Sequence, residues 1–209
     1  MIIFAWDVET NGLPLWDQPS DDPRQPHIVQ FGGLLISDEP RRVVAQMGLI
    51  VRPYGWSIDP EMTAIHGIDD AMAQAAGVDE RLVGRLFLTM RARADLEVGH
   101  NISFDKRMMR INLLRHGLIT REDADEGPPS FCTQRESTAI VNCPPTAKML
   151  AANRRGPKAP TLAEAYAHFF QDRLPAHDAM ADARAAARIY FRLREIASSN
   201  DQATGKDFP

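Results

Sequence analysis

The chain has 209 residues, 44% of them hydrophobic, which is enough for one globular domain with a core. The formal net charge of −4 excludes a basic protein that coats nucleic acid, so any contact with nucleic acid needs a local site. Two cysteines, Cys132 and Cys143, without a paired CxxC exclude a disulfide framework and a structural zinc site. The start "MIIFAWDVET" has no basic residue and its apolar run stops at Asp7, so we expect neither a signal peptide nor a membrane span, and a cytoplasmic location.

Three strands are predicted near the start of the chain. The run "MIIFAWD" predicts a buried strand that ends at Asp7, and the loop "TNGLPLWDQPSDDPRQP" follows it. Residues 27–37 and 41–53 predict two more strands. The short polar turn "DEPR" between them favours antiparallel pairing.

The periodicity then becomes helical. Residues 59–77 predict one helix, and residues 79–94 predict a second with Leu82, Leu86 and Met90 on its apolar face.

A strand and a helix are predicted next. Residues 95–101 predict a short strand. Residues 103–117 predict a helix with Ser103 as its N-cap and Gly117 as its C-cap. One more short strand is expected within 126–134.

The last third of the chain is predicted to be helical apart from a basic loop. The loop covers residues 146–160. A helix follows over 161–170, capped by Thr161 with Glu164 completing a capping box. The last long helix is expected from about residue 178 to 197, with a frayed tail after it.

The chain begins with predicted strands and continues with alternating helices and strands. This order predicts an α/β fold with a mixed sheet flanked by helices. We expect residues 1–198 to form the domain and residues 199–209 a polar tail.

Two predicted helices carry an acid on the apolar face. Asp105 has Met108 and Met109 at helical spacing after it, where a lone carboxylate is costly. Asp182 heads an apolar stripe formed by Ala186, Ile189, Leu193 and Ile196.

The first strand contributes two further acids. Asp7 and Glu9 are two residues apart and therefore point to one face of a strand. Taken alone, each acid has an ordinary explanation, either a solvated strand end or a favourable contact with a helix dipole. Together with Asp105 and Asp182 they predict one carboxylate cluster. Two Mg²⁺ or Mn²⁺ ions would relieve its repulsion and suit phosphodiester hydrolysis.

The segment "PAHDAMADARAA" places His177 and Asp178 just before the last helix. Asp178 is expected to cap the N–H of residue 180 or 181. A histidine that ordinarily titrates near pH 6.5 suits proton removal from water, so His177 is a candidate general base.

At this point the chain resembles a known family, the DEDDh or DnaQ-like 3′→5′ exonucleases. Residues 7–12, "DVETNG", are similar to the first family motif, and residues 99–105, "GHNISFD", to the second. Residues 177–183, "HDAMADA", are similar to the third, and "IHGI" at 65–68 matches a segment between the first two. The motifs occur in family order and span residues 4–190.

The resemblance implies a ribonuclease H-like fold with a five-stranded mixed sheet. It implies an enzyme that removes nucleoside monophosphates from single-stranded DNA 3′ ends by a two-metal mechanism. In that mechanism, Mg²⁺ or Mn²⁺ ions, two per active site, are held by Asp7, Glu9, Asp105 and Asp182, and His177 is the general base. The residues expected to bind the terminal nucleotide are Thr10, Leu13, Ile65, His66, Asn101 and Phe104.

The chain departs from the family pattern at three places. Asn11 stands where the family often has Thr, Gln30 where its second strand usually has Glu, and Cys132 where many members have Asp. None of these differences removes a predicted metal ligand.

Three alternatives stay open. A 3′→5′ RNA exonuclease or oligoribonuclease would use the same carboxylates, because these do not read the sugar. An HD-type phosphohydrolase would use His177 and Asp178, but it needs an all-helical framework, which the predicted strands disfavour. A catalytically idle nucleic-acid-binding module is disfavoured because all four acids and the histidine are present.

Further residues bear on partners. Lys148, Arg154, Arg155 and Lys158 either follow a phosphate backbone or form a solvated loop. Trp16 either stacks on a base or anchors its loop. Few residues follow the last predicted helix, so we expect a stand-alone nuclease without a polymerase-binding extension. A homo-oligomer is compatible with the sequence.

Overall fold

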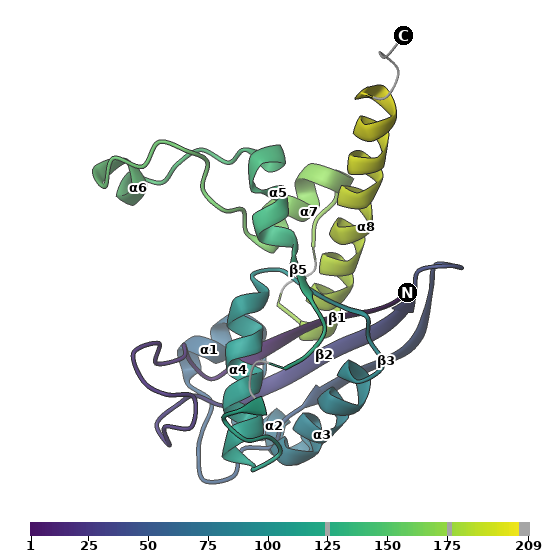
Figure 1. Cartoon of the computed structure of the whole chain (residues 1–209). Helices are drawn as coiled ribbons and strands as arrows, with labels where there is room; N and C mark the ends of the chain where they lie inside the picture. The colour runs from purple at the N-terminus through teal and green to yellow at the C-terminus, as the bar shows by residue number, and fades with distance from the viewer. Residues whose placement is uncertain (124–125, 175–176, 205–209) are drawn as a thin grey trace.

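A five-stranded mixed sheet forms the centre of the computed structural model, which describes residues 1–123, 126–174 and 177–204 (Figure 1). The strands lie in the order β3-β2-β1-β4-β5. β1 pairs antiparallel with β2 and β2 with β3, whereas β4 and β5 are parallel additions on the other side of β1. The mixed sheet predicted from the sequence is therefore confirmed. The strands are β1 Ile2–Thr10, β2 Ile28–Ser37, β3 Arg42–Ile50, β4 Leu96–Gly99 and β5 Ser130–Cys132.

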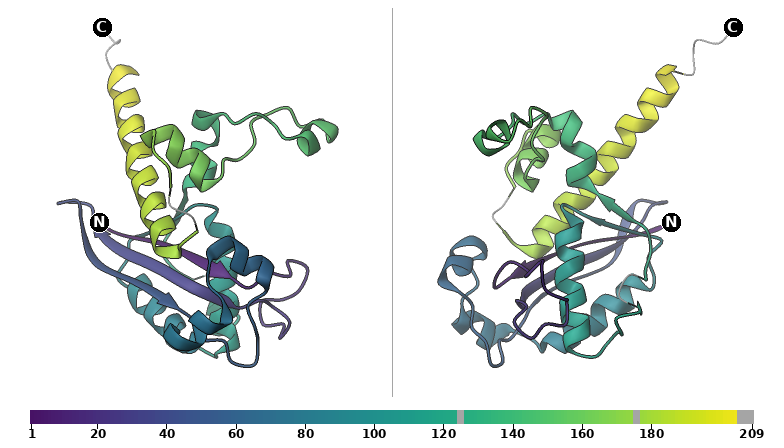
Figure 2. Two further views of the ribbon diagram at one scale, coloured as in Figure 1. Left: turned by 180° about the vertical axis from the view of Figure 1, so that it is seen from behind. Right: turned by 60° about the vertical axis from the view of Figure 1, so that its left-hand side comes forward.

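Helices cover both faces of this sheet (Figures 1 and 2). The faces follow from the two-residue period of β1. Phe4 and Trp6 pack among side chains of α3 and α4, and Ile3 and Ala5 pack against α8. The helices are α1 Pro60–His66, α2 Asp70–Ala76, α3 Glu80–Arg91, α4 Ile102–Arg115, α5 Thr133–Val141, α6 Ala147–Ala151, α7 Leu162–Phe170 and α8 Ala179–Thr204.

The long helix α8 carries the stripe expected from its sequence. Ala186, Ile189 and Leu193, which follow Asp182 along this face, are buried, whereas Ile196 is only partly buried; Asp182 itself is 9% exposed. The helix continues to Thr204 and not to about residue 197. Residues 205–209 of the predicted tail lie outside the described residues.

Several predicted helix boundaries were wrong. Residues 59–77 form two helices, because Gly67 takes a left-handed φ of 75° and ends α1. Asn101, not Ser103, is the N-cap of α4, and it too is left-handed with φ 63°. At the other end, His116 is the C-cap and Gly117 follows it with φ 60°.

The buried face of α3 also differs from the predicted one. Val83, Phe87 and Met90 are buried, whereas Leu82 is 43% exposed. The Phe87 ring fills the space beside Phe4 and Trp6, with centroids 5.6 and 4.8 Å away, and this contact sets the rotation of the helix.

Two helices were missed. Residues 133–141 form α5, and the predicted loop 146–160 contains α6, capped by Thr146. α6 has only five residues, and the apolar residues of α5 all lie at its C-terminal end, so neither shows a helical hydrophobic periodicity. None of the helices in the described part of the chain is both long and apolar enough to cross a membrane.

Candidate active site

The carboxyl end of β1 receives a side chain from α4. β1 pairs with β4 over residues 3–5, and β1 then continues beyond β4. The free Val8 N–H donates to Oδ1 of Asp105 at 3.3 Å. This bond holds Asp105, which is buried in the first turn of α4, next to Asp7 and Glu9.

The start of α8 is tied to the neighbouring strand β2 by Gln30. The Gln30 Nε2 donates to Asp178 Oδ2 at 2.8 Å, and the Gln30 Oε1 accepts from the Ala179 N–H at 2.9 Å. Gln30 lies directly opposite Glu9 in the β1–β2 register. Glu9 and the first turn of α8 are therefore positioned by the same pair of strands.

Sequence reasoning noticed Gln30 as a departure from the family pattern but missed this role. The signal was a polar residue within the apolar strand "IVQFGGLLI". Two positions later, Gly32 permits the close approach. A Cβ there would lie 2.3 Å from the carbonyl carbon of Ala179, so a larger residue would push α8 away.

Asp178 caps α8 as predicted. Its Oδ1 accepts from the Ala181 N–H at 2.9 Å, while its Oδ2 is held by Gln30. The segment "PAHDAMADARAA" therefore separates into a cap at Asp178 and a site-facing pair, His177 and Asp182.

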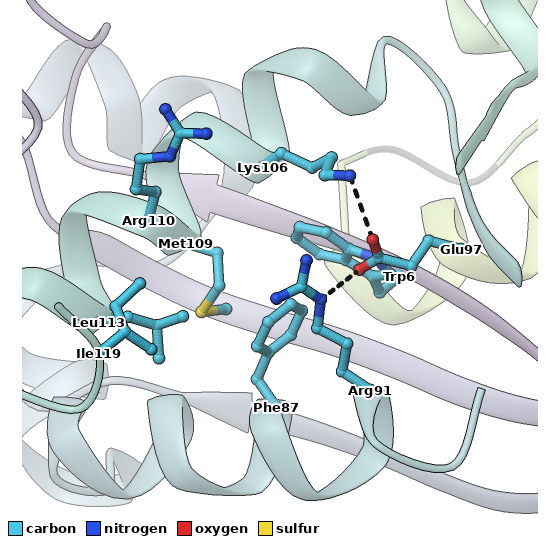
Figure 3. A pocket seen from close by; sticks show the side chains of 9 residues that line it. All are labelled: Trp6, Phe87, Arg91, Glu97, Lys106, Met109, Arg110, Leu113 and Ile119. Atoms are coloured by element: carbon cyan, nitrogen blue, oxygen red, sulfur yellow. Dashed lines mark ion pairs between the residues drawn. The ribbon is translucent and has the colours of Figure 1, made fainter. Parts of the chain in front are cut away.

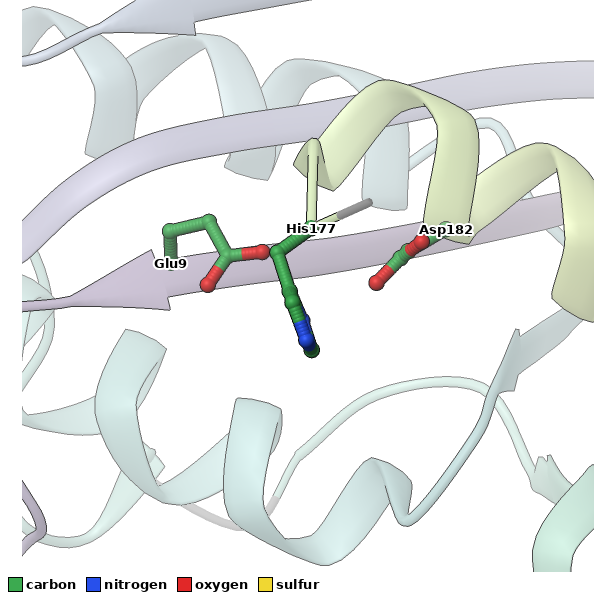
Figure 4. A group of neighbouring side chains, drawn as sticks. All are labelled: Glu9, His177 and Asp182. Carbon is green, nitrogen blue, oxygen red and sulfur yellow. The ribbon is translucent and has the colours of Figure 1, made fainter. Parts of the chain in front are cut away.

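Glu9, His177 and Asp182 meet at one point. One ligand atom from each, two carboxylate oxygens and one ring nitrogen, lie within 4.8 Å of one another. Figure 4 shows Glu9 on β1 and Asp182 on α8, with the His177 ring beside both. His177 is exposed to solvent, whereas Asp182 is nearly buried.

The acids of this cluster resist ionisation. Burial raises the pKa of Asp7 well above its usual range, and the charges of Asp105, Asp182 and Glu9 raise it further. Burial followed by the charge of Asp182 raises the pKa of Glu9 to about 7. Burial also raises the pKa of Asp105 to about 8 and that of Asp182 to about 6.

This donor set fits divalent cations. Asp7 and Asp105 lie close enough to Glu9 and Asp182 for these charges, in addition to burial, to raise their pKa values, and no described lysine or arginine forms an ion pair with any of the four. The buried Oδ1 of Asp182 accepts no hydrogen bond from the described residues. Oxygen-rich sites of this kind suit Mg²⁺ and Mn²⁺, and a nitrogen from His177 within reach would also be compatible with other metals.

The raised pKa values predict a pH dependence for the protein in EDTA. In the folded protein the acids hold protons that the unfolded chain releases near pH 4. Their contribution to the free energy of unfolding is therefore complete at low pH, and it is lost as the pH rises through the folded-state pKa values of about 6, 7 and 8. We expect the Tm in EDTA to fall by several degrees between about pH 5 and pH 8. Mn²⁺ should restore it, and more strongly at pH 8, because metal binding displaces these protons.

Thermal unfolding followed at several pH values with EDTA or Mn²⁺ checks this expectation. A Tm in EDTA that is constant or rises over this pH range would contradict the raised pKa values of the buried acids.

Replacing Asp178 by Ala is expected to cost mainly stability. It removes the cap on Ala181 N–H and the bond from Gln30, and loss of a cap costs about 1 kcal/mol. Urea denaturation measures the change. Asp178→Asn keeps an acceptor for Ala181 but loses the bond from Gln30, so comparison of the two variants isolates the contribution of the cap. Loss of turnover in a fully folded Asp178→Ala protein would contradict this assignment.

The predicted nucleotide-binding residues occupy different surroundings. Leu13 is 76% and Ile65 47% exposed, so both can meet a ligand. Asn101 is exposed and Phe104 is partly buried against the core around Trp6. Thr10 is buried and its hydroxyl donates to the Gly12 carbonyl at 2.8 Å, which shapes the loop after β1.

Two histidines near the site differ in their contacts. His66 is buried; its pKa is lowered first by burial and also by nearby His177, while a contact with the Thr10 backbone opposes the shift. This places His66 on the active-site side of α1. His100, by contrast, is held by Thr133 Oγ1 and the Pro160 carbonyl, each 3.0 Å from a ring nitrogen, which is a structural role.

Trp16 is 59% exposed with the Arg107 guanidinium 6.0 Å from its ring centroid. Arg107 also donates to the carbonyls of Leu15 and Gln18. The loop is therefore anchored through Arg107, while the Trp16 ring keeps an open surface.

A small cavity lies on the face of the sheet that α3 and α4 cover, opposite α8 (Figure 3). It is not a competing active site. Its volume of about 60 Å³ is too small for a nucleotide. Glu97 is fully buried there between Arg91 Nε at 3.3 Å and Lys106 Nζ at 3.2 Å. Because Lys106 follows Asp105 on α4, this ion pair holds α4 against β4 and helps to fix the position of Asp105.

Comparison with known proteins identifies the family. The family model described as Exonuclease (RNase_T) matches residues 4–190. The chain belongs to this exonuclease family. The resemblance to DnaQ-like exonucleases with a ribonuclease H-like fold is thereby confirmed, and the all-helical HD-type alternative was wrong. Among curated proteins, no sequence matches the chain.

Solved structures of exonuclease I share the fold. The E. coli enzyme in complex with a dA16 oligonucleotide superposes with a TM-score of 0.65 at 19% identity, over 92% of this chain and 40% of that one. A product-bound exonuclease I gives 0.67 at 18% identity, over 93% and 43%. A zinc-bound complex of the E. coli enzyme with single-stranded DNA gives 0.61 at 18% identity, over 92% and 40%. The chain thus spans less than half the length of these proteins.

Proposed function

We propose that the protein is a metal-dependent 3′→5′ exonuclease that removes nucleoside monophosphates from the 3′ ends of single-stranded DNA. The observation that carries the proposal is the convergence of Asp7, Glu9, Asp105 and Asp182 from three elements at the carboxyl end of β1, with His177 exposed beside them. Family membership supports nuclease chemistry, and the exonuclease I structures bound to single-stranded oligonucleotides support the choice of substrate.

The four carboxylates would hold two Mg²⁺ or Mn²⁺ ions. When bound, such a pair activates water and stabilises the leaving oxygen of the scissile phosphate. His177 would take the proton from the attacking water, since it is exposed and lies within reach of Glu9 and Asp182. Gln30 would fix the start of α8 through the Ala179 N–H, so that His177 and Asp182 keep their positions relative to Glu9.

Residues around the cluster would hold the terminal nucleotide. Leu13 and Ile65 offer exposed apolar side chains for the base, and Asn101, held in a left-handed conformation before α4, presents an amide to the sugar and phosphate. Thr10, His66 and Phe104 would shape the pocket from positions that are buried or partly buried.

The deciding experiment uses matched DNA and RNA oligomers labelled at the 5′ end, with free or phosphate-blocked 3′ ends, in Mg²⁺. We expect a ladder that shortens from the 3′ end of the DNA, stops with EDTA and is suppressed by the block. Faster degradation of RNA would make the protein an RNA exonuclease or oligoribonuclease. Binding without cleavage in Mn²⁺ would make it an idle binding module.

A further inference from the structure

The segment between α5 and α7 has an unusual charge. Residues 142–160 contain four basic residues and no acidic one, in a chain whose net charge is −4. We refer to these residues as the basic arm. The basic residues are Lys148, Arg154, Arg155 and Lys158.

The basic arm extends away from the body of the molecule. α6 lies at its tip, and an isolated bridge between Cys143 and Lys158 joins its two sides. Most of its residues are exposed, including Leu150 at 53%. In all views of Figures 1 and 2 the arm projects on the side of the molecule to which the carboxyl end of β1 points.

The base of the arm is fixed next to the active site. The Pro160 carbonyl lies 3.0 Å from His100 Nε2 and accepts from Gln134 Nε2 at 3.1 Å. His100 directly precedes Asn101, the N-cap of the helix that carries Asp105. The Lys158 ammonium pairs with Glu164 at 2.5 Å, which secures the returning side of the arm.

Three cations remain available at the outer part of the arm. Lys148, Arg154 and Arg155 are exposed, and none of them forms an ion pair with the described residues. The arm is mostly exposed and has no acidic residue to neutralise these cations, so their charge is available to an anionic ligand.

We propose that the basic arm binds the phosphate backbone of the substrate strand upstream of the 3′-terminal nucleotides. The proposal rests on the proposed exonuclease function and assigns the arm a place in substrate binding. Lys148, Arg154 and Arg155 bind phosphates, and the carboxylate cluster acts on the end of the same strand.

The chemistry of the arm favours this ligand over an acidic protein. The arm contains no aromatic residue, so it offers charge without a platform for bases, and its contacts are independent of sequence. The arm projects on the side to which the carboxyl end of β1 points, where a strand would extend if its 3′ end lay at the carboxylate cluster (Figures 1 and 2). The chain carries a net charge of −4, which repels a nucleic-acid strand, and the positive charge of the arm offsets this repulsion locally.

A dependence on substrate length follows. A strand of about 16 nucleotides can reach the arm, whereas one of about 4 nucleotides occupies only the active site. Binding of the long strand also displaces counterions from three phosphates, so its affinity decreases more steeply with salt.

The test combines Lys148→Gln, Arg154→Gln and Arg155→Gln in one variant of the full chain. We expect the KM for a DNA of about 16 nucleotides to rise at least about tenfold, with kcat unchanged and with normal kinetics on a DNA of about 4 nucleotides. The slope of log affinity against log salt should decrease by about 2 for the long DNA. The matched control replaces Arg81, Arg85 and Arg93, which are exposed on or near α3, by Gln and should behave as the unmodified protein.

Three results would overturn the proposal. The arm variant could leave the long substrate unaffected, it could impair short and long substrates equally, or it could lose binding to anionic vesicles or an acidic protein while DNA kinetics stay normal. If the unmodified protein cleaves no oligonucleotide, the proposed function fails on its own. Fluorescence anisotropy of labelled DNA with the Asp7→Asn protein, with and without the arm substitutions, still tests the arm.

Discussion

Asp7→Asn is expected to abolish turnover and at the same time to stabilise the protein in EDTA. Burial is the main cause that raises the pKa of Asp7, and the charges of Asp105, Asp182, Glu9 and Asp178 add repulsion. A neutral amide removes that repulsion but is a poor metal ligand. If Asp7 holds the cations, the variant should lose at least about a thousandfold in kcat, which corresponds to about 4 kcal/mol of transition-state stabilisation.

The stability change has a defined sign and pH range. At pH 8 in EDTA, Glu9 and Asp182 are largely ionised, and the folded Asp7 either holds a proton that the unfolded chain has released or repels these charges. Asp7→Asn avoids both costs, so the variant should melt a few degrees higher than the unmodified protein. At pH 5 the cluster is mostly protonated in both proteins, and the difference should be smaller, because less of the cost of holding the Asp7 proton has accumulated above its unfolded pKa. Mn²⁺ should raise the Tm of the variant less than that of the unmodified protein.

Asp38→Asn is the matched control for this experiment. Asp38 follows β2 at the far end of the sheet and pairs with Arg194 at 2.8 Å. Its replacement should leave turnover unchanged and should lower the Tm slightly, because an exposed ion pair contributes about 1 kcal/mol or less. Full activity of Asp7→Asn in a preparation free of contaminating nuclease would show that the acid cluster is not the catalytic centre.

The acids could be predicted from the sequence because each one contradicts its local pattern. Asp105 and Asp182 interrupt apolar helix faces, and Asp7 and Glu9 end a buried strand. Such violations are expected at functional sites. The first strand could be predicted because the run of apolar β-formers that ends at Asp7 is too short for a helix.

The parts that could not be predicted depend on contacts between segments distant in the sequence. Gln30 is separated from Asp178 by most of the chain, and no local pattern indicates that its amide joins β2 to α8. The rotation of α3 depends on where the Phe87 ring meets Trp6. The split between α1 and α2 depends on a left-handed Gly67 within a sequence whose composition otherwise favours a continuous helix.

His177→Ala is expected to lower kcat by about a hundredfold to ten-thousandfold with the fold intact, which is the usual contribution of a general base. His177 is exposed, so its truncation should change stability by less than about 0.5 kcal/mol. His168→Ala is the matched control, because His168 is also exposed but lies on α7. Turnover with labelled DNA in Mg²⁺ measures the effect, and added imidazole should restore part of the lost rate.

The same variant separates two roles that the geometry allows for His177. Its ring nitrogen lies within 4.8 Å of carboxylate oxygens of Glu9 and Asp182, so the side chain is within reach of a shared cation as well as of water. If His177 is the base, the increase in Tm caused by Mn²⁺ should be retained in His177→Ala while turnover is lost. If His177 is a ligand, that increase should shrink together with turnover, and imidazole should restore both. A variant that keeps both the Mn²⁺ effect and full turnover would exclude His177 from the chemistry, and the base would then have to be sought among the solvent-accessible groups around Asp182.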